Sequence, residues 1–246
     1  MPDENAPDQT VIVYGVNPAF EVLRAGRRTI REAYLNRSSA DSPRLRRLAA
    51  LLQAKNIPQR LVEKGQLIDL SGSRDHQGVV LITDPYPYVP FAELLGKRRL
   101  VLLDNIEDPH NVGAIIRSAE VLGFDGLLLP RRGSPGILPS VLKASAGATE
   151  FLPIAINCAA NQYIKIAKEE GYHIAVLDGK GETTLEELQR RLPNKLLLVV
   201  GGEDKGAGQF ILNEADDVVS IPRRGQVSSL NASVAAGIAL AALVGE

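Results

Sequence analysis

The chain has 246 residues, of which 45% are hydrophobic and 23% are charged, and its formal net charge is −1. This composition is typical of globular proteins and excludes disordered, collagen-like and coiled-coil proteins. One cysteine, Cys158, and three scattered histidines form neither an intramolecular disulfide nor a zinc motif, so we expect no metal site. No run of eighteen uncharged apolar residues occurs and the first ten residues are polar and acidic, so we expect a cytoplasmic protein with no membrane partner.

The N-terminal third alternates short strands and helices. Gly26 is a typical helix end, and Ser42-Pro43 is a typical helix start. Three prolines at 85–90 exclude a helix or a central strand and indicate an extended linker. We predict a small α/β domain over residues 1–83 and a linker over 84–98. The predicted strands are 11–14, 30–35, 60–63 and 79–82, and the predicted helices are 17–25, one from Ser42 onward, and 66–70.

Positive charge is concentrated in this domain. Residues 24–60 contain ten Lys or Arg and two Asp or Glu, a net charge of +8, whereas residues 91–246 contain sixteen basic and nineteen acidic residues, a net charge of −3. One interpretation is the solvated face of an amphipathic helix. The other is an RNA-binding surface, because phosphates are bound by clustered basic residues. For that surface we select Arg24, Arg27, Arg28, Arg46 and Arg47.

From residue 99 onward, apolar strands alternate regularly with helices. This pattern predicts a parallel sheet covered on both faces, in a second domain over residues 99–246. Ligands of such sheets bind at the carboxyl ends of the strands. The predicted strands are 100–103, 127–129, 152–155, 173–177, 196–200 and 218–221, and the predicted helices are 111–122, 140–146, 160–170, 184–191, 209–214 and 231–244.

Three loops of the second domain carry unusual polar and glycine patterns. The first reads N-x-G-x-x-x-R from Asn111 to Arg117, and Asn111 suits a helix cap. The second reads G-G-E-x-x-G from Gly201 to Gly206 and matches neither a dinucleotide motif nor a P-loop. The third reads I-P-x-x-G-x-x-x-S-L-N-x-S-x-A from Ile221 to Ala235. Taken singly, each loop is explained by a cap, a turn or close helix packing.

Together, and in this order, the three loops resemble the motifs of the SpoU RNA 2′-O-ribose methyltransferases. Tyr14-Gly15 and the segment 76–80 resemble the ribosomal-protein-like RNA-binding domain of many such enzymes. The two-part arrangement is most similar to enzymes that methylate a guanosine of bacterial 23S rRNA. The resemblance implies S-adenosylmethionine as methyl donor, a C-terminal trefoil knot, 23S rRNA as substrate, and a homodimer with active sites at the subunit interface. Arg223 stands where methionine is common in the family.

The resemblance also implies roles for individual residues. Arg117 is the candidate group for handling the 2′-hydroxyl proton, Asn111 and Glu203 position it or the RNA, and Ser229 and Asn231 help to build the site. Neutralising an arginine of pKa above 12 at pH 7 would cost about 7 kcal/mol. Arg117 is therefore either a base in a strongly shifted environment or a charge stabiliser with water accepting the proton, and His110 is a rival base. The implied donor-binding residues are Val200, Gly201, Gly202, Gly206, Ile221, Leu230, Asn231 and Ala232.

Two other functions stay open on the sequence. One is a non-catalytic RNA-binding or ribosome-assembly protein, which would not require the combination of Asn111, Arg117, Glu203, Ser229 and Asn231. The other is a tRNA 2′-O-methyltransferase, which the full N-terminal domain and the lack of a basic tail after Val244 disfavour.

Overall fold

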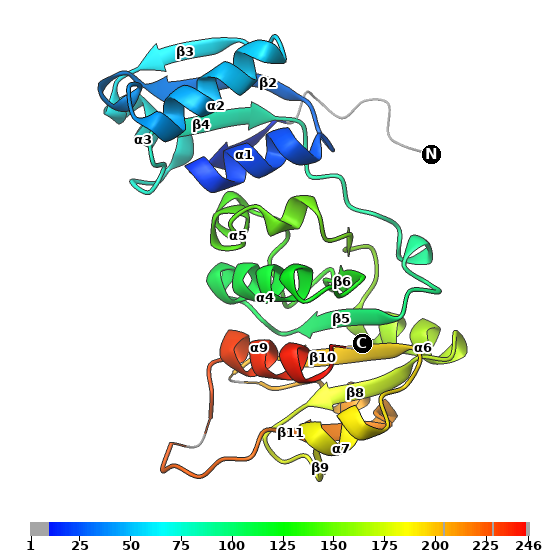
Figure 1. Ribbon diagram of the computed structural model, residues 1–246. Helices are drawn as coiled ribbons and strands as arrows, with labels where there is room; N and C mark the ends of the chain where they lie inside the picture. The colour runs from blue at the N-terminus through cyan, green and yellow to red at the C-terminus, as the bar shows by residue number, and fades with distance from the viewer. Residues whose placement is uncertain (1–9, 204, 228, 245–246) are drawn as a thin grey trace. The chain divides into compact units, whose positions relative to one another are not determined.

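The computed structural model describes residues 10–203, 205–227 and 229–244, and the chain divides into two compact units, residues 1–87 and 88–246 (Figure 1). Each unit combines helices with one β-sheet, and the second contains the parallel sheet expected from the sequence. Within the described part of the chain, no helix is both long enough and apolar enough to cross a membrane. The predicted α/β fold is confirmed.

The first unit is a four-stranded sheet in the order β1-β4-β2-β3. Strand β4 runs antiparallel to both of its neighbours, whereas β2 and β3 are parallel. Its elements are β1 (Val11–Tyr14), α1 (Val16–Ala25), β2 (Ile30–Asn36), a 3-10 turn (Arg37–Ser39), α2 (Pro43–Ala54), β3 (Gln59–Val62), α3 (Lys64–Ser71) and β4 (Val79–Thr83).

Local signals account for the helix boundaries of this unit. Helix α1 ends at Gly26, whose φ of 61° is a left-handed conformation that glycine adopts without strain. Helix α2 begins after Ser42, whose hydroxyl accepts a hydrogen bond from the Leu45 backbone, and Pro43 occupies the first helical position. Helices α1 and α2 pack against each other, and α3 packs on β1, β2 and β4.

The segment predicted as a linker, residues 84–98, is packed at both ends. Tyr86 is only 7% exposed, and the guanidinium groups of Arg27 and Arg28 lie 5.8 and 5.5 Å from its ring centre. Val89 donates a backbone hydrogen bond to the Ile154 carbonyl, and Phe91 lies in the core of the second unit. The segment predicted as a linker is therefore divided between the two units, which adjoin after Pro87.

The second unit is a seven-stranded sheet in the order β7-β6-β5-β10-β8-β11-β9, and every pair of neighbours is parallel. The two-residue strand β9 was not predicted from the sequence. The elements are a 3-10 turn (Phe91–Glu93), β5 (Arg99–Asp104), α4 (Pro109–Val121), β6 (Gly126–Leu128), α5 (Pro139–Ala144), a 3-10 turn (Ala148–Glu150), β7 (Ile154–Ala155), α6 (Ala160–Glu169), β8 (His173–Leu177), β9 (Thr183–Thr184), α7 (Leu185–Arg190), β10 (Leu196–Gly201), α8 (Gln209–Glu214), β11 (Asp217–Ser220) and α9 (Ala232–Ala242).

The order of strands in space departs from their order along the chain. Strand β10 lies between β5 and β8, and β11 lies between β8 and β9, so the last two strands pair with strands formed by earlier segments. The carboxyl ends of β5, β10, β8 and β11 therefore lie side by side at one edge of the sheet. In an open parallel sheet, this is the edge where ligands bind. The trefoil knot stays a prediction.

Helices cover both faces of this sheet. On one face, α4 packs against α5 and α9, and the two helices α4 and α9 lie next to each other (Figure 1). On the other face, α6 and α8 pack together over a core that includes Leu100, Leu197 and Tyr163. Gly113 allows α4 to approach α5 closely, because a Cβ atom there would lie 2.5 Å from the Cβ of Ala144. The same Cβ atom would also lie 2.8 Å from the Val141 carbonyl oxygen of α5.

A cluster of polar side chains ties β8, β9 and β11 together away from the ligand-binding edge. Asp217 is buried, and its carboxylate binds the His173 ring at 2.7 Å, the Thr183 hydroxyl at 2.8 Å and the Arg191 guanidinium. Burial by itself would raise the pKa of Asp217, but the hydrogen bonds from Arg191, Thr183 and His173 outweigh it and hold the pKa below its ordinary value. This cluster stabilises the folded state through an ionised carboxylate.

Candidate active site

The three sequence motifs meet at the carboxylate of Glu203. Its Oε1 atom accepts hydrogen bonds from Asn111 Nδ2 at 3.2 Å, from Asn231 Nδ2 at 2.7 Å and from the Ala232 backbone N–H at 3.1 Å. Asn231 Nδ2 also lies 3.0 Å from Asn111 Oδ1. Glu203 follows β10, Asn111 lies in α4 and Asn231 caps α9. Residues 120 positions apart in sequence are therefore held by one carboxylate.

The cap of α9 fixes Asn231 in this arrangement. Its Oδ1 accepts hydrogen bonds from the backbone N–H groups of Ser233 and Val234 at 3.0 and 3.3 Å, while its Nδ2 faces Glu203. The carboxylate thus lies at the N-terminus of α9, where the helix dipole and the free N–H groups favour negative charge. Asn231 is therefore the N-cap of α9.

The helix that carries Asn111 begins earlier than the sequence predicted. Asp108 is the N-cap of α4, since its carboxylate accepts a hydrogen bond from the His110 backbone at 2.9 Å, and Pro109 takes the first helical position. Asn111 is therefore not the cap, and its amide is available for Glu203.

Tight backbone packing positions the G-G-E-x-x-G loop. A Cβ atom on Gly202 would lie 2.0 Å from the Asn105 carbonyl oxygen, so only glycine fits there. Gly206 returns the loop with a φ of 61°, and its N–H donates to the Gly202 carbonyl at 2.8 Å. These glycines bring the loop after β10 onto the end of β5. They shape the loop itself, and Glu203 is placed as a result.

A buried carboxylate connects the same two segments. Asp104, the last residue of β5, is 6% exposed, and its Oδ2 accepts hydrogen bonds from the Gly208 N–H at 2.9 Å and from Asn105 Nδ2 at 3.1 Å. Burial raises the pKa of Asp104, and the hydrogen bond from Gly208 opposes that rise without cancelling it.

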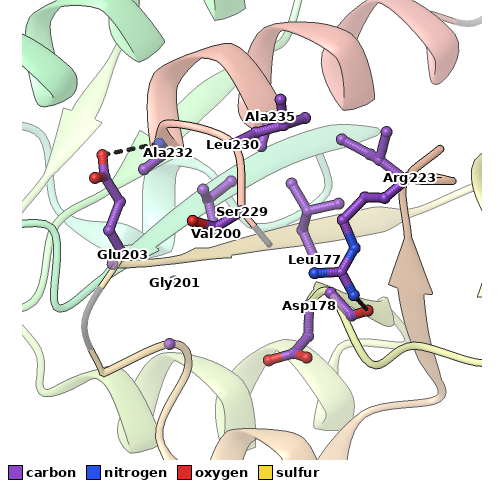
Figure 2. A pocket seen from close by; sticks show the side chains of 14 residues that line it. Leu177, Asp178, Val200, Gly201, Glu203, Arg223, Ser229, Leu230, Ala232 and Ala235 are labelled. Carbon is purple, nitrogen blue, oxygen red and sulfur yellow. Dashed lines mark hydrogen bonds between the residues drawn. The ribbon is translucent and has the colours of Figure 1, made fainter. Parts of the chain in front are cut away.

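An apolar cavity opens at the carboxyl ends of β8, β10 and β11 (Figure 2). Glu203 lies on one side of it, and Asp178 and Arg223 lie on the other. Asn231, which the sequence assigned to the donor, instead lines a neighbouring polar cavity with Asn105, Glu107, Asn111 and Lys205. The other predicted donor-binding residues all line the apolar cavity, namely Val200, Gly201, Gly202, Gly206, Ile221, Leu230 and Ala232.

The contribution of β8 to the apolar cavity was not predicted from the sequence. Leu177, Asp178 and Gly179 line it, as do Arg223 and Ala235. The Arg223 guanidinium donates to the Gly179 carbonyl at 2.7 Å and lies flat against this glycine, where a Cβ would be 3.3 Å away. Arg223 therefore links the loops after β8 and β11. An Asp-Gly pair directly after a buried strand was the available signal.

The two cavities meet at the Glu203 cluster. Gly202, Glu203 and Ala232 line both of them. One cavity has mainly aliphatic and glycine walls, whereas the other is lined by amide, carboxylate and ammonium groups. The arrangement can therefore hold an amphipathic ligand on one side and a polar ligand on the other, with their reacting atoms close to Glu203.

The remaining predicted site residues lie outside this cluster. The Arg117 side chain is exposed on α4 and makes no hydrogen bond or ion pair with any other described residue. Ser229 lines the apolar cavity and is exposed. His110 is exposed on the first turn of α4. Across residues 10–203, 205–227 and 229–244, no group of three His, Cys, Asp or Glu is placed to hold a metal ion.

The predicted RNA-binding arginines of the first unit differ in their surroundings. Arg28 is only 8% exposed, and Arg27 donates to the Pro87 carbonyl at 3.1 Å, so both hold the segment at Tyr86. The structure gives these two arginines a structural role that the charge count did not reveal. Arg24, Arg46 and Arg47 are exposed.

Both units match known families. The SpoU rRNA Methylase family matches residues 98–241, and a domain described as RNA 2'-O ribose methyltransferase substrate binding matches residues 12–89. A Mycobacterium leprae protein named as an uncharacterized tRNA/rRNA methyltransferase is 36% identical over 242 residues, which covers 95% of this chain and 77% of the relative.

Solved structures give the same fold. The SpoU methyltransferase AviRb from Streptomyces viridochromogenes, in complex with AdoMet, superposes with a TM-score of 0.80 at 24% identity over 96% of this chain and 89% of its own. The AdoMet-bound rRNA methyltransferase from Sinorhizobium meliloti has a TM-score of 0.79 at 22% identity over 95% and 86%. The A. aeolicus TrmH/SpoU tRNA modifying enzyme has a TM-score of 0.53 at 29% identity over 61% and 77%. The chain belongs to the SpoU rRNA methylase family of RNA methyltransferases.

Proposed function

We propose that this protein transfers the methyl group of S-adenosylmethionine to the ribose 2′-oxygen of a guanosine in 23S rRNA. The observation that carries the proposal is the convergence of Asn111, Glu203 and Asn231 at the junction of an apolar and a polar cavity. A protein that only binds RNA has no need for such a junction. The match of the first unit to a ribose methyltransferase substrate-binding domain supports the same reaction.

The apolar cavity suits the donor. Leu177, Val200 and Leu230 offer apolar surface for an adenine ring, and the glycine-rich loop leaves backbone groups accessible for hydrogen bonds. Asp178 and Arg223 supply charges of both signs at one side, which match a zwitterionic amino-acid tail (Figure 2). When bound, S-adenosylmethionine supplies an electrophilic methyl group on a sulfonium.

The polar cavity suits the ribose. Asn111 and Asn231 are held by Glu203, so their amides keep fixed orientations instead of reorganising during the reaction. Lys205 lines this cavity and donates to the Glu107 carboxylate at 2.8 Å, so the cavity wall carries one ion pair. We assign Glu203 the role of positioning the two amides, and Asn111 and Asn231 the role of orienting the substrate.

Arg117 is proposed to stabilise the 2′-oxygen as it loses its proton. Arg117 and Asn111 are six residues apart on α4, about 9 Å along the axis and about 120° around it. Arg117 therefore faces away from the cavities of its own subunit. A free guanidinium on the surface is instead suited to bind a phosphate and to stabilise alkoxide charge while water accepts the proton.

A homodimer accounts for this position. Arg117 shares a face of α4 with Val121, which is 70% exposed, and the adjacent helix α9 exposes Val234 and Ile238 to 51% and 42%. Exposed apolar side chains on two adjacent helices are typical of an interaction surface. We propose that two subunits pack through α4 and α9 and that Arg117 then serves the site of the partner subunit.

The two-unit architecture favours rRNA over tRNA as the substrate. The solved structures named as rRNA methyltransferases cover 95–96% of this chain, including its first unit. The structures whose names refer to tRNA cover 58–61%. The net positive segment of the first unit, residues 24–60, suits a large anionic substrate.

The proposal is tested with purified protein, labelled S-adenosylmethionine and a chelator, using deproteinised 23S rRNA, 16S rRNA and bulk tRNA as separate substrates. Label is expected in 23S rRNA alone. Labelling of tRNA with unmodified 23S rRNA would contradict the substrate, and absence of transfer to every RNA would contradict the enzyme. Light scattering of the same preparation is expected to give the mass of a dimer.

A further inference from the structure

The positive charge of the first unit is not evenly distributed once ion pairs are taken into account. Four basic residues of segment 24–60 bind carboxylates: Arg24 with Glu21, Arg31 with Asp84, Arg37 with Glu63, and Arg60 with Glu32. Arg27 and Arg28 hold Tyr86, as described above. These six side chains contribute little unpaired charge to the surface.

The other four basic residues all belong to helix α2 and its C-cap: Arg44, Arg46, Arg47 and Lys55. None of them forms an ion pair with a described residue. Arg44 donates to the neutral amide oxygen of Asn17, and Arg47 lies over the Phe20 ring at 5.9 Å. All four side chains are exposed. The unpaired positive charge is therefore concentrated on one helix.

A groove runs between this helix and α1. Arg44, Arg47 and Lys55 line it from α2, and Phe20 and Arg24 line it from α1. The lining has four basic residues and one acidic residue, Glu21, which is already paired with Arg24. Phe20 and Leu51 supply apolar surface within the groove. The groove is thus a basic channel with a partly apolar floor.

We infer that the groove between α1 and α2 binds the phosphate backbone of the RNA substrate, with Arg44, Arg47 and Lys55 as its phosphate contacts. Arg47 is held in place by the face of Phe20, and Arg44 by Asn17, so both guanidinium groups are oriented before RNA arrives. The inference rests on the proposed function because it takes RNA to be the substrate. Of the five arginines selected from the sequence it keeps Arg47 as a phosphate contact, and it adds Arg44 and Lys55.

The test compares two triple variants with the same change of charge. Variant one is Arg44→Gln with Arg47→Gln and Lys55→Gln, and the control is Arg31→Gln with Arg37→Gln and Arg60→Gln. Dissociation constants for deproteinised 23S rRNA are measured between 50 and 300 mM salt, about the range over which phosphate contacts dominate affinity. In a plot of log affinity against log salt concentration, each phosphate contact contributes about 0.7 to 0.9 to the slope. The slope of variant one is therefore expected to be about 2 to 3 smaller than that of the wild type. Variant one is also expected to bind the RNA about a hundredfold more weakly at 0.1 M salt.

The control variant is expected to keep the wild-type slope, because its arginines are already paired with carboxylates. Replacing Arg44 and Arg47 by lysine, which keeps the charge, is expected to restore most of the affinity lost in variant one. Circular dichroism confirms that each variant is folded, and calorimetry with S-adenosylmethionine is expected to give an unchanged donor affinity.

The inference would be overturned if the salt dependence of RNA binding fell equally in both triple variants. It would also be overturned if variant one bound RNA as the wild type does. Reduced binding of polyglutamate with unchanged binding of 23S rRNA would assign the groove to an acidic protein and would overturn it as well. If the wild-type protein transfers no methyl group to any RNA, the proposed function fails, but the comparison of slopes still decides whether the groove binds RNA.

Discussion

Replacing Glu203 by glutamine tests whether this carboxylate assembles the site. Its Oε1 atom accepts three hydrogen bonds, from Asn111, Asn231 and Ala232. A glutamine keeps an acceptor oxygen but loses the negative charge, so the three hydrogen bonds lose their charge assistance. At an exposed position the loss of folding free energy is about 1 kcal/mol, which lowers Tm by about 2–4 °C in a chain of this size.

The effect on catalysis is expected to be larger than the effect on stability. The two amides lose their fixed orientation, and misplacement of positioning groups by about 1 Å costs about a hundredfold in rate. Single-turnover methyl transfer with 23S rRNA measures that rate, calorimetry measures donor affinity, and Glu169→Gln on the exposed face of α6 is the matched control. A folded Glu203→Gln protein that transfers at more than a third of the wild-type rate would refute the positioning role.

Three other substitutions probe separate parts of the account. Arg117→Ala is expected to lower single-turnover transfer by about a hundred- to a thousandfold with unchanged donor affinity by calorimetry, and near-normal turnover would remove Arg117 from the mechanism. Gly202→Ala places a Cβ 2.0 Å from a backbone carbonyl and is expected to cost about 1–3 kcal/mol of stability and most of the donor affinity, whereas Gly65→Ala, in helix α3 with open space around it, is expected to lower neither. Because the folded-state pKa of Asp217 is lowered, its stabilisation is complete above the unfolded value near 4 and is lost as pH falls through the folded value. Denaturant unfolding of Asp217→Asn is therefore expected to show a weaker decline below about pH 4 than the wild type, and parallel pH profiles would contradict the assignment.

Strong local signals made much of the fold predictable from the sequence. Strand β8 was predicted at its observed boundaries because buried strands of a parallel sheet are continuous apolar runs. The resemblance of the three motifs to those of one family indicated a shared site. The contribution of Asp178 to the apolar cavity was not predicted, although an Asp-Gly pair after a buried strand was its local signal, because the order β10-β8-β11 depends on long-range pairing.

A charge count also could not predict the roles of individual basic residues. Arg27 and Arg28 were predicted to bind RNA, but they pack on Tyr86, which lies nearly sixty residues further along the chain. Lys55 was not selected, although it lines the groove with Arg44. Net charge locates a positive region, whereas ion pairing and burial determine which of its side chains remain available.

The measurement that tests the central claim most directly is the chemical position of the transferred methyl group. 23S rRNA is labelled with the protein and labelled S-adenosylmethionine, then hydrolysed with alkali, which leaves a dinucleotide uncut wherever the 2′-oxygen is methylated. The account predicts that the label appears in a single alkali-resistant dinucleotide with guanosine as its 5′ nucleoside, and that Arg117→Ala protein leaves it unlabelled. Label in alkali-sensitive mononucleotides would show methylation of a base and would contradict the account.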